Sequence, residues 1–445
     1  MPNKHNEVKE IDFEIEGGKE LHGSVTTKSS KNAAVVLLCA SLLNKNTTTL
    51  KNVARIEEVN RLVEVLESIG VSVKWEGESI VIKPTGKINL ANIKTESAQK
   101  TRSILLFLGP LLHHFEEFDL PQAGGCKLGT RTVRPHLFAL EKFGVSIDAK
   151  TDHYHVKRKF LEPAEIVMYE SGDTATENAI MAAALIPGKT TIKYASANYQ
   201  VQDLCFFLEK LGVKIDGIGT TTIMIHGVKD INTPVTYEPG EDPIDSMLFL
   251  SLAATNNSEL EILRAPIEFL ELELLKLEKM GFKYSLSEPY FSHNGRTKLV
   301  DIKTYHSSLV ALEDKIEARP YPGLNIDNLP FFVPIATVAS GQTLIHDWVY
   351  ENRAIYYTEL QKMGAEMILA DPHRLYVTGP TKLRPVDMAC PPALRPAAII
   401  LIAMLAAPGK STLRNVYSIL RGYQDLANRL AALGARVKAN VNTNT

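Results

Sequence analysis

The chain of 445 residues exceeds the roughly 250–300 residues at which a single hydrophobic core stops growing, so it predicts two domains of about 200 residues each. Hydrophobic residues make up 45% and charged residues 22%, which is typical of a globular protein and excludes a disordered or fibrous chain. The 49 Lys and Arg against 51 Asp and Glu leave a net charge of −2, which excludes a globally basic nucleic-acid binder. Any anion must therefore be bound by a local cluster of cations.

The N-terminal residues 1–18 lack the apolar stretch of a signal peptide. The longest apolar run, residues 397–407, is shorter than the roughly 20 residues that cross a bilayer. The cysteines are far apart and show neither CxxC spacing nor histidine partners, so we expect free thiols and no metal site. They are Cys39, Cys126, Cys205 and Cys390. We expect a cytoplasmic protein without a membrane partner, a metal or an organic cofactor.

One phrase returns six times along the chain, first as LESIGVSV at Leu66 and last as LAALGARV at Leu430. Each copy combines apolar residues at helical spacing with a glycine, which predicts a helix that ends where the backbone takes a positive φ. The β-branched residues that follow predict a strand and a hairpin. The six glycines are Gly70, Gly144, Gly212, Gly281, Gly364 and Gly434.

A second phrase consists of a turn and a threonine-rich strand, as in IPGKTTIKY after Leu185 and APGKSTLRN after Ala406. It follows helical stretches that are apolar on all sides, such as residues 396–407, which predicts helices buried inside surrounding sheets. The GKT and GKST fragments lack the earlier glycine of a phosphate-binding P-loop and lie at the turn of the repeat. Six units of strand, helix, strand, helix, strand and strand result, in two groups of three.

The periodicity breaks at YEPGEDPID, residues 237–245, where prolines and a glycine predict a hinge between the two groups. We expect one discontinuous domain formed by residues 1–29 and 240–445. The other domain spans residues 30–239 and carries the loop with Cys126.

Two stretches in the first half carry residues that a fold does not require. In KSSKNAAV, Lys31 and Asn32 stand at a predicted helix N-terminus, which favours a phosphate or carboxylate; the alternative is a solvated lysine after a serine cap. In GGCKLGTRTVR, glycines allow the backbone to approach a ligand, with Cys126, Arg131 and Arg134 nearby. A tight turn with an incidental cysteine is the alternative there.

The second half adds an acid and three arginines at the ends of predicted elements. Asp327 lies in ARPYPGLNIDNLPFF, where capping a helix is the alternative role. Arg353 and Arg395 stand at predicted helix starts, and Arg421 stands before Gly422. Arginine matches phosphate and carboxylate in a bidentate manner, although a surface arginine is usually only solvated.

At these stretches the sequence resembles the enolpyruvyl transferase superfamily, over nearly the whole chain and most closely the branch that acts on UDP-N-acetylglucosamine in peptidoglycan synthesis. The resemblance depends on short motifs in family order. They are KNAA at Lys31, LGPLL at Leu108, GGCxxGxR from Gly124, ATEN at Ala175, IGTTTIMIHGV at Ile218, YPGxxxD from Tyr321, ENR at Glu351 and RGY at Arg421.

The resemblance implies an α/β fold of two inside-out, barrel-like domains, each of three βαβαββ repeats around buried helices, that close at a hinge. The implied reaction transfers the enolpyruvyl group of phosphoenolpyruvate to a hydroxyl of UDP-N-acetylglucosamine through a tetrahedral ketal, with release of phosphate. The partners would be small molecules only, and we expect a monomer that binds no nucleic acid.

The resemblance also implies residue roles. Cys126 would be the acid or the product-release thiol, Asp327 the base on the sugar hydroxyl, and Lys31 a further catalytic group. The phosphoenolpyruvate site would comprise Lys31, Arg131 and Arg421, supported by Arg102, Arg353 and Arg395. The acceptor site would comprise Asn32, Arg102, Thr132, Val133, Arg134 and Asp327.

The departures from the family lie mainly on the acceptor side. Thr132–Pro135 occupies the position of a Pro-Val-Asp-Leu run in the family. Glu170 replaces a lysine near the diphosphate, and Leu106 replaces a tryptophan. SGDTATEN stands for a Ser-Val-Gly-Ala-Thr run, and Ala393 for an aspartate tied to the thiol loop. Two alternatives follow: an enolpyruvyl transferase for another nucleotide such as uridine monophosphate, or a homologue that binds phosphoenolpyruvate or nucleotide without catalysis.

Overall fold

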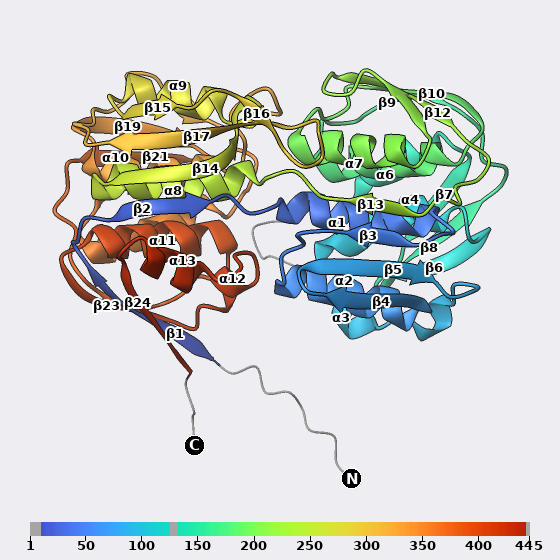
Figure 1. The fold of residues 1–445 in the computed structure, drawn as a ribbon, viewed down its shortest axis with the longest axis horizontal. Coiled ribbons are helices and arrows are strands. Elements are labelled where there is room, and N and C mark those ends of the chain that lie inside the picture. The colour runs from blue at the N-terminus through green and yellow to red at the C-terminus, as the bar shows by residue number, and fades with distance from the viewer. Residues whose placement is uncertain (1–9, 125–131, 442–445) are drawn as a thin grey trace, which may run out of the picture.

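The computed structural model describes residues 10–124 and 132–441, which form two lobes joined at the centre (Figure 1). Each lobe has its own hydrophobic core. The first core gathers residues between Ala34 and Tyr237, and the second gathers Phe13 to Val25 and residues from Ile244 to Ala435 together with Tyr199. These two cores support the domain division expected from the sequence, which we propose as the organisation of the chain.

Three small sheets belong to the first lobe. Their strand orders are β13-β3-β5-β4, β6-β8-β7 and β11-β12-β10-β9. The strands are β3 (Thr48–Leu50), β4 (Val71–Glu76), β5 (Ser79–Pro84), β6 (Glu117–Pro121), β7 (Val145–Ala149), β8 (His153–Arg158), β9 (Glu165–Val167), β10 (Gly188–Lys193), β11 (Lys214–Asp216), β12 (Thr222–Gly227) and β13 (Val235–Tyr237).

Three further sheets belong to the second lobe, with the orders β22-β23-β1-β24, β15-β17-β14-β2 and β18-β19-β21-β20. The strands are β1 (Ile11–Gly17), β2 (His22–Thr26), β14 (Glu259–Pro266), β15 (Lys283–Leu286), β16 (Tyr290–Phe291), which pairs with β17 (Lys298–Tyr305), β18 (Ile316–Glu317), β19 (Gly341–His346), β20 (Glu366–Leu369), β21 (Arg374–Gly379), β22 (Asp387–Ala389), β23 (Gly409–Arg414) and β24 (Arg436–Val441). All sheets except β6-β8-β7 add a parallel strand to antiparallel neighbours.

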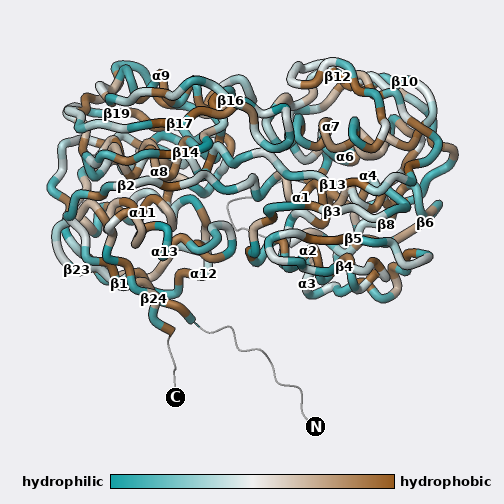
Figure 2. The backbone as a smooth tube through the Cα atoms, in the orientation of Figure 1, coloured by the Kyte–Doolittle hydropathy of each residue, from teal (hydrophilic) through white to brown (hydrophobic). Residues whose placement is uncertain are grey.

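The helices inside the lobes are buried on all sides, as the sequence predicts. They are α1 (Lys31–Ala40), α4 (Leu108–Leu111), α6 (Asp173–Ala184), α8 (Pro243–Asn256), α10 (Phe332–Val338) and α11 (Leu394–Ala406). In the second lobe α8 packs against α10 and α11, and in the first lobe α6 packs against α4. Figure 2 shows hydrophobic stretches of the tube concentrated on these internal elements.

The remaining helices range from largely buried, such as α7, to one without any buried residue, η2. They are α2 (Glu57–Ser68), α3 (Thr95–Gln99), α5 (Arg134–Glu141), α7 (Tyr199–Lys210), α9 (Glu271–Lys279), α12 (Tyr417–Leu420) and α13 (Leu426–Ala432), with the 3-10 helices η1 (Ser41–Leu43), η2 (Leu90–Asn92), η3 (Arg102–Phe107), η4 (Ile267–Phe269), η5 (Leu329–Phe331) and η6 (Ala354–Met363). The inside-out α/β arrangement is confirmed, and its six sheets stay separate in the described residues rather than joining into a closed barrel.

The repeat phrase is confirmed in detail. All six of its glycines have φ between 84° and 95°, and a helix or 3-10 helix ends before each one. The GKT and GKST fragments begin strands β10 and β23, so they are not phosphate-binding loops. These glycines mark structural turns because their backbone conformation strains any residue with a Cβ.

The chain passes between the lobes twice, in residues 27–30 and 238–242. The two segments are paired: the Ser30 amide donates to the Gly240 carbonyl at 2.7 Å, and the Asp242 amide donates to the Lys28 carbonyl at 2.8 Å. One of these segments is the predicted hinge. Movement about it stays a prediction.

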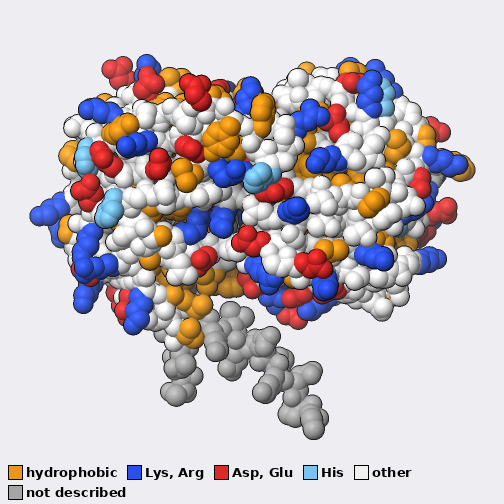
Figure 3. All heavy atoms as spheres, viewed as in Figure 1, with side chains coloured by type: hydrophobic (Ala, Val, Ile, Leu, Met, Phe, Trp, Pro, Cys, Tyr) orange, Lys and Arg blue, Asp and Glu red, His pale blue; other side chains and the backbone are white. Residues whose placement is uncertain are grey.

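The surface shows the expected mixture of charges. Figure 3 shows Lys and Arg interspersed with Asp and Glu on the visible face of both lobes. No helix within the described ranges is both long and apolar enough to cross a membrane.

Candidate active site

A cavity of about 1090 Å³ lies between the two lobes and is lined by both. The first lobe contributes the N-termini of α1, α2, η3 and α6. The second lobe contributes the loops around Asp327 and Tyr350, the start of α11, and Arg421 after α12. Residues 268–273, at η4 and α9, also line the cavity, so elements from all six repeats converge on one space.

Lys31 is held at the N-terminus of α1. The Ser30 hydroxyl caps this helix by accepting from the Ala33 amide at 3.0 Å. Lys31 Nζ lies 2.6 Å from Glu58 Oε2, and its side chain is only 13% exposed. The next residue, Asn32, donates to the Tyr199 hydroxyl at 2.8 Å. The alternative of a solvated lysine is therefore wrong.

Glu58 is a site residue that the sequence interpretation missed. It accepts from Lys31 and from the Ser103 hydroxyl at 2.8 Å. Burial raises the pKa of Glu58, but Lys31, Ser103 and Arg421 outweigh burial and lower it to about 2. Arg421 is therefore close enough to act on the same charge cluster.

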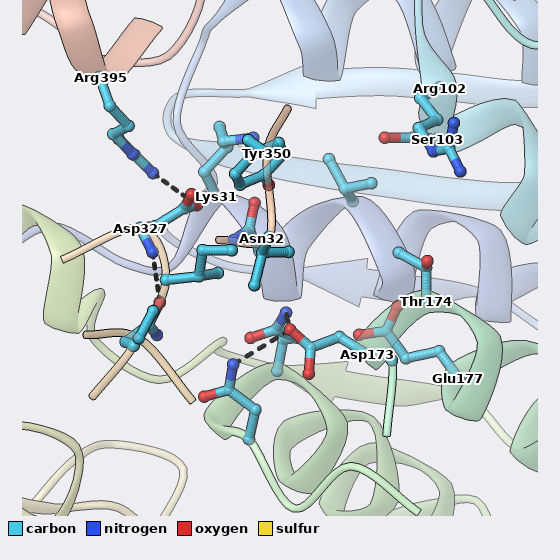
Figure 4. A pocket seen from close by; sticks show the side chains of 18 of the residues that line it. Lys31, Asn32, Arg102, Ser103, Asp173, Thr174, Glu177, Asp327, Tyr350 and Arg395 are labelled. Atoms are coloured by element: carbon cyan, nitrogen blue, oxygen red, sulfur yellow. Dashed lines mark hydrogen bonds and ion pairs between the residues drawn. The ribbon is translucent and has the colours of Figure 1, made fainter. Parts of the chain in front are cut away.

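Asp327 faces this cluster from the second lobe. Its Oδ2 lies 3.2 Å from Arg395 Nη2 (Figure 4). Its Oδ1 lies 3.7 Å from Arg353 Nη1. Burial raises the pKa of Asp327, but Arg395, Arg353 and Lys31 hold it below its ordinary value. Asp327 does not cap a helix, because η5 begins after Asn328 and has no side-chain cap. It is an ionised carboxylate with its charge in the cavity.

Arg353 positions Asp327 and is itself occupied by hydrogen bonds within the protein. It is 1% exposed and donates to both oxygens of Asp347, at 2.6 and 2.8 Å. It also donates to the Ile326 carbonyl at 2.9 Å, next to Asp327. The Tyr357 hydroxyl completes the group by donating to Asp347 at 2.6 Å. The expected contact of Arg353 with phosphoenolpyruvate is therefore less favoured than a positioning role.

Arg395 lies in the first turn of α11. It is 7% exposed and donates to the Tyr423 hydroxyl at 2.6 Å as well as to Asp327. Ala393, which stands for the family aspartate, is buried and gives α11 no side-chain cap. Arg395 remains a cation that borders both Asp327 and the cavity.

The acceptor residues divide into two groups. Arg102 and Thr132 line the cavity, and Arg102 donates to the Thr132 carbonyl at 3.0 Å. Val133 packs against the first core, and neither it nor Arg134 belongs to the cavity lining in the described residues. Cys126 and Arg131 lie outside the described residues, although Gly124, which precedes them, lines the cavity.

A second acidic group lies at the start of α6. Glu170, Asp173 and Glu177 all line the cavity. Asp173 accepts from the Asn198 amide at 3.1 Å, the Gln200 amide at 2.7 Å, and the Ser196 hydroxyl. The sequence interpretation treated SGDTATEN only as a departure from the family. The acidic spacing of Asp173 and Glu177 on one helix face was the available signal.

Lys31, Glu58, Asp327 and Arg395 are held by other protein groups. Within residues 10–124 and 132–441, no three His, Cys, Asp or Glu side chains gather as a metal ion requires. The arrangement can bind an anion beside Lys31, Arg395 and Arg421. It can also hold a hydroxyl beside the Asp327 carboxylate.

Comparisons with known proteins agree with this geometry. A family model described as EPSP synthase (3-phosphoshikimate 1-carboxyvinyltransferase) matches residues 15–430. The chain is 34% identical over 430 residues to the UDP-N-acetylglucosamine 1-carboxyvinyltransferase of Bradyrhizobium diazoefficiens, covering 96% of this chain and 98% of that one. It is 33% identical over 426 residues to the protein of the same name from Borrelia garinii subsp. bavariensis, covering 95% and 98%.

Solved structures share the fold. The enolpyruvyl transferase NikO from Streptomyces tendae superposes with a TM-score of 0.84 at 24% identity, over 98% of this chain and 100% of that one. EPSP synthase from Acinetobacter baumannii superposes with a TM-score of 0.75 at 16% identity, over 97% and 100%. The family match, the full-length relatives and the cavity between two inside-out lobes lead to one conclusion: the chain belongs to the EPSP synthase family of enolpyruvyl transferases.

Proposed function

We propose that the protein transfers the enolpyruvyl group of phosphoenolpyruvate to a hydroxyl of UDP-N-acetylglucosamine and releases phosphate. Full-length relatives of that name at 33–34% identity support this acceptor. The observation that carries the chemistry is the ionised Asp327, held by two arginines in the cavity that Lys31 lines from the opposite lobe. The reaction would belong to peptidoglycan synthesis.

The reaction has two balanced steps. In the first, the acceptor oxygen bonds to C2 of phosphoenolpyruvate, its proton leaves, and a proton is added to the C3 methylene, which gives a tetrahedral ketal. In the second, a proton leaves C3, the double bond re-forms, and the bond from C2 to the phosphate oxygen breaks. Each assisted proton transfer contributes about 10²–10⁴-fold to the rate.

The side chains divide this work. Asp327 accepts a hydrogen bond from the acceptor hydroxyl and takes its proton as the new bond forms. Lys31, Arg395 and Arg421, which line the cavity, hold the carboxylate and phosphate of phosphoenolpyruvate, because ammonium and guanidinium groups form charge-assisted hydrogen bonds with such anions. Arg353 fixes the loop of Asp327. Cys126 would supply the proton to C3 or assist product release, with Arg131 as a further anion ligand.

We further infer a cytoplasmic monomer that closes about its two crossing segments and takes only small-molecule substrates. The cavity supports the monomer because a single chain supplies both of its walls. The paired segments support the closure, since they connect the lobes at one place.

The test is the release of phosphate from phosphoenolpyruvate by the purified protein with UDP-N-acetylglucosamine, uridine monophosphate, shikimate 3-phosphate or no acceptor. We expect release with UDP-N-acetylglucosamine. Release with only another acceptor would contradict the proposed acceptor and keep the reaction. Binding of phosphoenolpyruvate without any release would contradict catalysis.

A further inference from the structure

One side chain of the first lobe is packed in the core of the second. Tyr199 is the first residue of α7, and it is 5% exposed. Its ring meets the Phe269 ring of η4 edge to face, with 5.8 Å between the centroids. Among the residues that the structure describes, Tyr199 is the only one from the first lobe in the second hydrophobic core. The second lobe therefore holds the Tyr199 ring, because buried aromatic pairs favour a specific geometry.

The contact continues toward the loop of Asp327. The Phe269 ring lies 5.3 Å from the Tyr321 ring, centroid to centroid. Tyr321 begins the YPG stretch that precedes Asp327, and both residues line the cavity. Three aromatic rings therefore connect α7 of the first lobe to the loop that carries the proposed base.

The hydroxyl of Tyr199 binds a residue of its own lobe. It accepts from Asn32 Nδ2 at 2.8 Å. Asn32 follows Lys31 in the first turn of α1 and lines the cavity. Within the described ranges no group donates to Asn32 Oδ1, so this oxygen is left to accept from a ligand.

Tyr199 keeps its proton at this position. Burial raises the pKa of Tyr199 well above its ordinary value, and the charges of Asp242 and Asp327 act in the same direction. A phenol of this kind does not serve as a base at neutral pH. The hydroxyl therefore has a positioning role, which is to hold Asn32.

We infer that Tyr199 is a positioning residue whose ring is anchored in the second lobe and whose hydroxyl orients the Asn32 amide of the first lobe toward the acceptor. This inference rests on the proposed function for its choice of acceptor. An amide that is fixed before binding loses less side-chain entropy on binding than a mobile one. Because the ring and the hydroxyl contact opposite lobes, the orientation of Asn32 depends on the arrangement of the two lobes.

Tyr290 of β16 provides a matched control. Its hydroxyl donates to Asp301 at 2.6 Å, and the residue is half-buried. Tyr290 is absent from the cavity lining in the described part of the chain. Tyr290→Phe therefore removes one tyrosine hydrogen bond without changing the site.

The experiment is calorimetric titration of UDP-N-acetylglucosamine, without phosphoenolpyruvate, into the wild type, Tyr199→Phe, Asn32→Ala, their double variant and Tyr290→Phe. Tyr199→Phe keeps the ring and removes the hydroxyl, so we expect about three- to tenfold weaker acceptor binding. Asn32→Ala should weaken binding at least as much. Adding Tyr199→Phe to Asn32→Ala should have no further effect, because the hydroxyl acts through Asn32. Tyr290→Phe should bind as the wild type does.

Kinetics and melting separate this role from a merely structural one. In phosphate-release assays Tyr199→Phe should raise the KM for UDP-N-acetylglucosamine about three- to tenfold, while kcat and the KM for phosphoenolpyruvate change less than about twofold. A structural defect would instead lower kcat through a smaller folded fraction, without a selective change in KM. The Tm of Tyr199→Phe should fall less than that of Tyr199→Leu, because only leucine removes the ring from the second core.

The inference is overturned if Tyr199→Phe binds UDP-N-acetylglucosamine as tightly as the wild type, or if its effect adds in full to that of Asn32→Ala. Equal weakening by Tyr290→Phe would also overturn it. Weakened binding in Tyr199→Phe without any phosphate release by the wild type would overturn the proposed function and leave the positioning role intact. Absence of any binding of UDP-N-acetylglucosamine to the wild type would overturn both.

Discussion

The acidic side chains of the cavity form two groups whose pKa values are shifted in opposite directions. Burial raises the pKa of Glu58 and Asp327, but Lys31 and the arginines reverse the shift. Burial also raises the pKa of Asp173 and Glu177, and no cation reverses it there. Nearby cations therefore decide in which direction the pKa of each group is shifted.

The largest effect should come from removing the ionised acid. Asp327→Asn keeps the shape of the side chain and removes its ability to take a proton, so we expect kcat for phosphate release to fall about 10²–10⁴-fold. Phosphoenolpyruvate binding, measured by calorimetry, should remain. Unchanged kcat would remove Asp327 from the reaction and weaken the contrast between the two groups.

Lys31→Met tests the ion pair between Lys31 and Glu58. The variant leaves the half-buried Glu58 without its main partner, which costs about 1–3 kcal/mol in the free energy of unfolding. Adding Glu58→Gln should restore much of this stability, but not phosphoenolpyruvate affinity. Urea unfolding and phosphoenolpyruvate titration of the single and double variants check both parts, and recovery of affinity in the double variant would contradict the role of Lys31.

The contributions of Glu58 and Glu177 to stability should change with pH in opposite directions. The pKa of Glu58 is lowered to about 2, so its stabilising contribution is present above its ordinary value of 4.5 and is lost as the pH falls toward 2. The pKa of Glu177 is raised, so its contribution becomes less favourable as the pH rises above that ordinary value. At pH 7, Glu58→Gln should lose about 2–3 kcal/mol, while Glu177→Gln should gain stability.

Urea unfolding at pH 7 and pH 4 measures this difference. At the lower pH both glutamine variants should move closer to the wild type. If both variants changed the free energy of unfolding in the same direction at pH 7, burial alone, rather than partner charge, would govern both acids.

The smallest effect should come from Glu170, the exposed acid that lines the cavity just before α6. Glu170→Gln removes one solvent-exposed charge, so we expect the KM for a diphosphate acceptor to fall by a few-fold at low salt. Salt should reduce the effect because exposed charges are screened. An unchanged KM at low salt would place the acceptor phosphates far from Glu170.

The fold followed from the sequence to a large extent. The six repeat glycines and the all-apolar helices predicted six units with internal helices, because helix endings and burial are read from local patterns. The separation of the sheets and the pairing of residues 27–30 with 238–242 depended on contacts between distant segments. Such contacts leave no local pattern.

The candidate site was only partly predictable. Lys31, Asn32, Asp327 and Arg395 line the cavity as expected, while Arg134 does not. Glu58 was missed because an acid at the start of an amphipathic helix usually serves the helix dipole. Its role depends on Lys31, which comes from another helix.

What the sequence by itself determined is the family, the repeat and most of the cations, since these depend on residue type and order. What only the tertiary structure decided is the state of each charge. The Arg353 guanidinium donates hydrogen bonds to Asp347, and arginines keep Asp327 ionised. The Glu177 Oε1 atom is left without a hydrogen-bond partner. Ionisation depends on distances between side chains from different repeats, because electrostatic interactions act through space rather than along the chain.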